Sequence, residues 1–111
     1  MSPSVSIIQS SLQTEAVVDI RGRRLNVRKL TALDKLRLFK AAGPELSQNH
    51  PWLGMAMLAS AVVSIDDIPV PSPVNEQQIE ALVGRLGDDG IAAIARSETF
   101  AEVDGLSDAG N

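Results

Sequence analysis

The sequence predicts a small α+β domain that is predominantly helical, with an N-terminal β-hairpin followed by about four helices and a second short hairpin at 62–70. Two kinds of pattern predict this class. Short runs of β-branched residues flank turn residues near position 22, and again near positions 66 and 67, which is typical of hairpins. Longer segments repeat their apolar residues at intervals of three and four, which is typical of helices.

The N-terminal hairpin is expected to pair residues 16–20 with residues 24–30 across a turn at 21–23. The turn contains a glycine, which supplies the positive φ that a tight turn needs. In the second strand Leu25 and Val27 share one face, so that face should pack while the opposite, polar face meets water.

The first helix should begin after Thr31, with Asp34 as the acid of a capping box, and should stop at Gly43 and Pro44.

This helix has apolar residues on two sides. Ala32, Leu36 and Phe39 form one stripe, with Leu33 at its border, and we expect that stripe to face the core. Leu38 points to the opposite side. Either both sides are covered, or Leu38 is free to contact a partner.

The next helix is expected over 52–63, with Pro51 in its first turn and apolar residues all round, which predicts a central buried helix. Its 12 residues are too few to span a bilayer, which needs about 20. Asp66 and Asp67 then form a two-residue turn, although such turns prefer glycine at the second position. The prolines at 69–73 predict a stiff, extended connector.

Asn75 should cap the following helix together with Gln78, and Gly87 should end that helix before a last one begins near Asp89. Its apolar stripe is Ile79, Leu82, Val83 and Leu86.

Length and composition fit one domain. The chain has 111 residues, 44% of them hydrophobic and only 3% aromatic, so its core must consist mainly of Ala, Leu, Ile and Val. We expect a single domain over 15–103, between flexible segments at 1–14 and 104–111. The absence of cysteine excludes disulfides, thiolate metal sites and a cysteine nucleophile, and fits a reducing cytosol.

Charge divides the chain into a basic and an acidic part. Residues 1–44 contain eight basic and three acidic residues, whereas residues 45–111 contain two basic and eleven acidic residues. This layout can steer charged partners and can orient copies of the protein head to tail.

A basic patch on the hairpin is a candidate for binding phosphates. Its members are Arg21, Arg23, Arg24, Arg28 and Lys29. The interleaved aromatic residues that read single-stranded nucleic acids are missing. A charged edge that discourages strand addition is the alternative interpretation.

Four apolar residues are candidates for contact with a partner polypeptide: Leu38, Trp52, Met55 and Met57. The alternative is that they belong to the core. No catalytic constellation is visible, because His50 is the only histidine and has no Ser, Asp or Glu at a catalytic spacing. We therefore expect no enzyme, no metal site and no cofactor.

Three stretches between residues 16 and 97 resemble the small tail assembly chaperones of long-tailed bacteriophages. They are VVDIRGRRLNVRKLTALDKLRLFKAAGPE, WLGMAMLASAVVSID and IEALVGRLGDDGIAAIA. The resemblance implies a non-catalytic helper in the host bacterial cytoplasm that binds the tape-measure protein and tail-tube subunits during assembly. Asp67 departs from the pattern, which has glycine after "SID".

Two alternatives stay open: a small nucleic-acid-binding regulator using the basic hairpin, and a structural tail or connector protein. Self-association is a further expectation.

Overall fold

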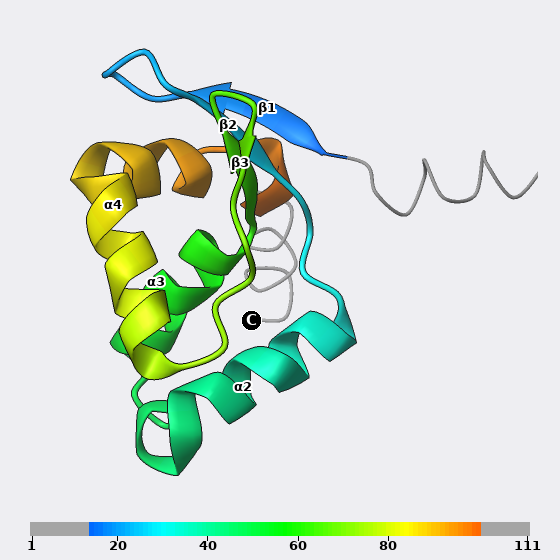
Figure 1. Cartoon of the computed structure of the whole chain (residues 1–111), viewed down its shortest axis with the longest axis vertical. Helices are drawn as coiled ribbons and strands as arrows, with labels where there is room; N and C mark the ends of the chain where they lie inside the picture. The colour runs from blue at the N-terminus through cyan, green and yellow to red at the C-terminus, as the bar shows by residue number, and fades with distance from the viewer. Residues whose placement is uncertain (1–13, 101–111) are drawn as a thin grey trace, which may run out of the picture.

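The computed structural model describes residues 14–100 as a four-stranded antiparallel sheet with helices packed on one of its faces (Figure 1). Along the chain the elements are β1 (Glu15–Val18), β2 (Arg24–Val27), α2 (Ala32–Leu46), α3 (His50–Ser60), β3 (Val62–Ile65), β4 (Ile68–Pro69) and α4 (Glu76–Ala95). The predicted α+β class, with its N-terminal hairpin and second short hairpin, is confirmed. The segments expected to be flexible, 1–14 and 104–111, lie outside the described residues apart from Thr14.

The first hairpin has the predicted faces. Leu25 and Val27 are fully buried, while Arg24 on the opposite face is exposed. Gly22 adopts the positive φ that its place in the turn requires, at 82°. Strand β2 then pairs with β3, which lies far along the chain, so the two hairpins form one sheet in the order β1-β2-β3-β4.

The second hairpin turns at two aspartates. Asp66 and Asp67 both have positive φ, at 49° and 68°, so the predicted turn is confirmed without the expected glycine. Aspartate tolerates this conformation better than most residues. Arg24 stabilises the turn, since its backbone N–H donates to Asp66 Oδ1 at 2.8 Å and its guanidinium pairs with Asp67.

Helix α3 is shorter and less buried than the sequence predicts. It ends at Ser60, and the two valines that follow belong to β3. Only Ala56 and Ala59 are buried within it, and Met55 is 49% exposed, so the prediction of a central buried helix is wrong. The small alanines let α3 approach its neighbours closely on one side, while the larger Trp52, Leu53, Met57 and Leu58 are half-buried against the core and Met55 faces solvent.

Helices α2 and α4 both begin at a side-chain N-cap, and both contain a glycine that interrupts the helix. Thr31 caps α2 in a complete capping box with Asp34, and the Asn75 side chain accepts from Gln78 N–H at the start of α4. Each is interrupted by a glycine with positive φ, Gly43 in α2 and Gly87 in α4. The break at Gly87 is the predicted boundary between the last two helices.

The core has two parts. The larger cluster lies between the sheet and α4 and includes Leu25, Val27, Leu86 and Ile94, each fully buried. The smaller cluster lies where α2, α3 and α4 meet and is built on Leu38, Ala56 and Ile79. Helix α2 therefore sits at the end of the molecule away from the sheet (Figure 1).

The two ends of the described chain are joined. The Glu15 carboxylate accepts hydrogen bonds from the backbone N–H groups of Glu98 and Thr99 at 3.0 and 2.9 Å, and from the Thr99 hydroxyl at 2.7 Å. These bonds, the hydroxyl first, lower the pKa of Glu15.

Candidate functional site

The outward side of α2 carries three large apolar side chains. Leu33, Leu36 and Phe39 are 52%, 64% and 39% exposed, and we call this surface the outer face of α2. Leu38, by contrast, is 4% exposed and packs in the smaller core cluster. The predicted orientation of this helix is therefore wrong: the stripe expected in the core faces out, and the residue offered to a partner faces in.

An ion pair explains this orientation. Asp34 lies one helical turn before Leu38 on the same side of α2. Arg28, which directly follows β2, donates two hydrogen bonds to the Asp34 carboxylate, at 2.7 and 3.0 Å. Because Arg28 is fixed to the end of the sheet, the side of α2 that carries Asp34 and Leu38 turns toward the body of the protein. Hydrogen bonding to Arg28 also holds the pKa of Asp34 well below its usual range.

Three cations lie on α2 beside the outer face. Within residues 14–100, Lys35, Arg37 and Lys40 are exposed and form no ion pair. The one acid in this part of the helix, Asp34, is bound to Arg28. The surface therefore combines exposed apolar area with uncompensated positive charge.

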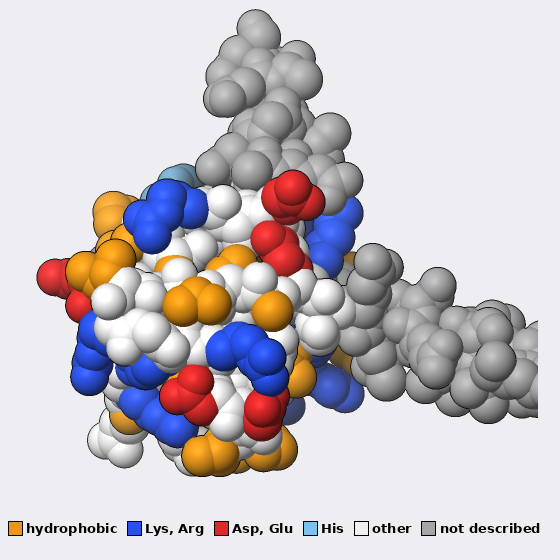
Figure 2. Space-filling view, turned by 90° about the horizontal axis from the view of Figure 1, so that it is seen from above, with side chains coloured by type: hydrophobic (Ala, Val, Ile, Leu, Met, Phe, Trp, Pro, Cys, Tyr) orange, Lys and Arg blue, Asp and Glu red, His pale blue; other side chains and the backbone are white. Residues whose placement is uncertain are grey.

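The basic patch predicted on the hairpin does not form a continuous surface. Three of its arginines are paired with carboxylates: Arg23 with Asp19 at 2.8 Å, Arg24 with Asp67 at 2.9 Å and Arg28 with Asp34 at 2.7 Å. In the view onto the sheet end of the molecule, acidic and basic side chains lie next to one another (Figure 2). Of the predicted patch, Arg21 and Lys29 have no ion pair among the residues that the structure describes.

Arg23 has a structural role. Its Nε donates to the buried Asp19 at 2.8 Å, and its two terminal nitrogens donate to the backbone carbonyls of Arg85 and Leu86 at 3.0 and 2.6 Å. Those carbonyls end the first segment of α4, just before Gly87, so Arg23 satisfies groups that the helix leaves open. Burial raises the pKa of Asp19, but hydrogen bonds from Arg23 and from the Arg21 N–H outweigh it and lower the pKa overall. An acid four residues before an arginine across a glycine turn was the available sequence signal.

The candidate partner residues on α3 do not form one surface. Trp52 packs in the smaller core cluster, and its indole N–H donates to Glu80 Oε2 at 3.1 Å. Met57 packs against the same cluster, and it also lines a shallow groove of about 400 Å³ together with Met55, His50 and Phe100. Among residues 14–100, no carboxylate or hydroxyl residue lines that groove beside His50.

The described residues hold no group of three His, Asp or Glu side chains that could bind a metal ion. Between residues 14 and 100, no helix combines the length and the apolar character that crossing a bilayer requires.

Comparison of the chain with protein-family models, with curated proteins and with solved structures finds no match. Its function must therefore be inferred from its own surface, on which the outer face of α2 groups three exposed apolar side chains along one helix.

Proposed function

We propose that this chain is a non-catalytic binding protein that acts as a phage tail assembly chaperone, holding the tape-measure protein and tail-tube subunits during tail morphogenesis. The observation that carries the proposal is the outer face of α2, on which Leu33, Leu36 and Phe39 are exposed together.

An exposed apolar stripe of this kind is suited to another helix. Its residues follow one another at three-residue intervals, so they lie along one side of α2 and match the anchor spacing of an amphipathic helix that docks lengthwise. Contiguous apolar surface on a protein that must stay in solution commonly marks a contact with a partner. Lys35, Arg37 and Lys40 keep the surroundings hydrated and favour an acidic partner.

The nucleic-acid alternative is weaker on this geometry. Phosphate binding needs arginines that are free to reach the backbone, whereas Arg23, Arg24 and Arg28 are already bound to carboxylates. Breaking those pairs would cost free energy before any phosphate contact formed.

Co-purification tests the proposal. We expect the full chain, co-expressed with its proposed tape-measure client, to co-purify with that protein and keep it soluble. Leu36→Ser with Phe39→Ser should reduce the recovered complex about tenfold, since each change removes burial of a large apolar side chain. Because these side chains are exposed in the free protein, the variant should keep its melting temperature.

A matched control uses two exposed apolar residues elsewhere. Val18→Ser with Ile68→Ser removes side chains that are 62% and 60% exposed on the sheet, and it should leave the complex intact. Equal loss with both double variants, or no complex with the wild-type chain, would contradict the proposal. Retention of the chain in purified phage particles would favour a structural tail protein instead.

A further inference from the structure

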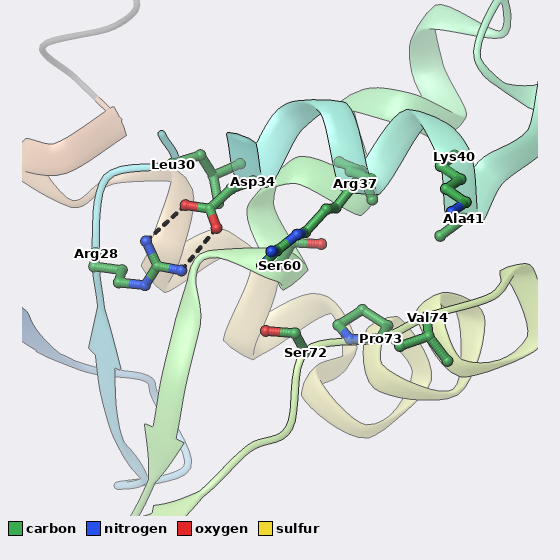
Figure 3. A pocket seen from close by; sticks show the side chains of 11 residues that line it. Arg28, Leu30, Asp34, Arg37, Lys40, Ala41, Ser60, Ser72, Pro73 and Val74 are labelled. Carbon is green, nitrogen blue, oxygen red and sulfur yellow. Dashed lines mark hydrogen bonds and ion pairs between the residues drawn. The ribbon is translucent and has the colours of Figure 1, made fainter. Parts of the chain in front are cut away.

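A second feature of α2 is a pocket on the side next to its outer face. The pocket has a volume of about 510 Å³ and lies between α2 and the connector that leads to α4, with the end of α3 at its base (Figure 3). That volume lies within the range of small-molecule sites. None of the three outer-face residues lines it, so it is a separate site on the same helix.

The pocket carries net positive charge. Arg37 and Lys40 line it from α2, and neither forms an ion pair within residues 14–100. Arg28 and Asp34 also line it, but they neutralise each other through two short hydrogen bonds. Asp34 Oδ2 also accepts a hydrogen bond from the Thr31 N–H at 2.8 Å, so this carboxylate already caps the start of α2. Two cations therefore remain for a ligand.

A polar group in the pocket lacks a partner. The hydroxyl oxygen of Ser60 is buried, and it makes no hydrogen bond in the described part of the chain. Figure 3 shows the Arg37 side chain extending from α2 toward Ser60 across the pocket. A buried hydroxyl without a partner is unfavourable, and a ligand oxygen that it reaches by rotating about χ1 into the pocket would relieve that cost.

The remaining walls are apolar apart from Ser72 of the connector. Leu30, Leu38 and Ala41 form one side, and Pro73 and Val74 of the connector form the other. This surface suits a short apolar chain attached to the anion. It does not suit a phosphate dianion, which is costlier to remove from water than a single carboxylate.

We propose that this pocket binds a carboxylate joined to a short apolar chain. Arg37 and Lys40 hold the carboxylate, and the apolar chain lies between Leu38 and Val74. The Ser60 hydroxyl, which is buried in the free protein, rotates about χ1 into the pocket and donates to one of the carboxylate oxygens. A free small acid and an acidic side chain of a partner polypeptide offer the same chemistry. The site does not depend on the proposed chaperone function.

Titration of the full chain with hexanoate, followed by NMR of the backbone amides, tests this site. We expect hexanoate to shift the amide signals of Ala41, Ser60 and Val74, and neutral hexanamide of the same length to bind about tenfold more weakly. Arg37→Gln and Lys40→Gln should each weaken hexanoate binding about fivefold to tenfold. Lys35→Gln removes the same charge from the same helix outside the pocket, and it should change the affinity little.

Ser60→Ala gives a readout that a purely structural serine would not. We expect this change to weaken hexanoate binding about threefold while the melting temperature stays the same or rises, because it removes a hydroxyl that has no partner. A drop in melting temperature with unchanged affinity would count against the assigned role of Ser60.

Two further probes distinguish a free small acid from an acidic side chain of a partner polypeptide. If acetyl-Leu-Glu-amide produces the same NMR shifts as hexanoate and the neutral peptide acetyl-Leu-Gln-amide does not, the site accepts an acidic side chain of a polypeptide. If hexanoate binds and the peptide does not, the ligand is a free acid, and both results support the carboxylate site. The site would be overturned by equal binding of hexanoate and hexanamide, by equal effects of Arg37→Gln and Lys35→Gln, or by tighter binding of inorganic phosphate.

Discussion

Helices α2 and α4 are both amphipathic, both begin at a side-chain cap and both are interrupted by a glycine, yet they orient their apolar stripes in opposite ways. Helix α4 turns Ile79, Leu82 and Leu86 inward, where they are 1%, 7% and 0% exposed. Helix α2 turns Leu36 and Phe39 outward and buries Leu38 and Ala42.

The difference shows that amphipathicity and orientation are separate properties. Helix α3 and the sheet together supply α4 with a broad apolar surface, so its stripe has one favourable position. Helix α2 packs against the middle of α3 and the first turn of α4, and the Arg28–Asp34 pair fixes which side faces them. This apolar stripe, held away from the core by a polar contact, is the basis on which we propose a partner outside the chain.

Truncating one leucine in each helix should give the largest contrast. Leu86→Ala empties a fully buried position and should lower the free energy of unfolding by about 4 kcal/mol. Leu36→Ala changes an exposed position and should stay within about 0.5 kcal/mol of the wild type. Urea unfolding monitored by circular dichroism measures both values, and similar losses would mean that the outer face of α2 is covered in the free protein.

Removing the side chain that bonds each glycine break should lower the free energy of unfolding more at Gly87 of α4 than at Gly43 of α2. Arg23→Met leaves the buried Asp19 carboxylate without its cation and should cost about 3 kcal/mol. At the break in α2, the Ser47 hydroxyl donates to the Gly43 carbonyl at 2.7 Å, and Ser47→Ala should cost only about 1 kcal/mol. The same urea measurement compares them, with Arg21→Met as a control for the loss of an arginine from this turn. Equal costs at the two breaks would show that Arg23 adds nothing beyond an ordinary hydrogen bond.

Acid should weaken the start of α2 and spare the start of α4. The pKa of Asp34 is lowered in the folded protein, so its stabilising contribution is complete above its unfolded value near 4 and is lost as the pH falls toward its folded value. Asn75 and Gln78, which cap α4, do not titrate. Amide hydrogen exchange at pH 7 and pH 3 should therefore show a selective loss of protection in the first turn of α2, worth about 1 kcal/mol.

The expected control is Asp34→Asn, which should lower protection in that turn already at pH 7 and remove most of its pH dependence. Parallel loss in both helices on acidification would mean that global unfolding, rather than this cap, sets the response.

Much of the fold follows from local chemistry. The faces of β2, the caps at Thr31 and Asn75, and the break at Gly87 depend on residues within a few positions of one another, and all were predictable. The aspartate turn at 66–67 was also predictable, because two β-branched runs flank it.

The candidate site could be predicted only in part. The sequence identifies α2 as a helix with two apolar sides, but the choice between them depends on Arg28, which precedes the helix and reaches Asp34 across a loop. The pairing of Arg24 with Asp67 and the contact of Arg23 with α4 join residues more than 40 positions apart. Such contacts arise only once β2 pairs with β3, so the basic residues looked like one patch in the linear chain.

The bonds at the edges of the molecule have a consequence for its synthesis on the ribosome. The N-terminal hairpin is translated first, but the carbonyls that Arg23 binds lie 62 and 63 residues later, and the backbone donors to Glu15 lie 83 and 84 residues later. A nascent chain that stops short of these positions can pair β2 with β3, but it lacks the bonds that fasten the first hairpin to α4 and to residues 98–99. We expect it to stay open to proteases and chaperones until nearly all of the described domain has emerged, and then to close in one step.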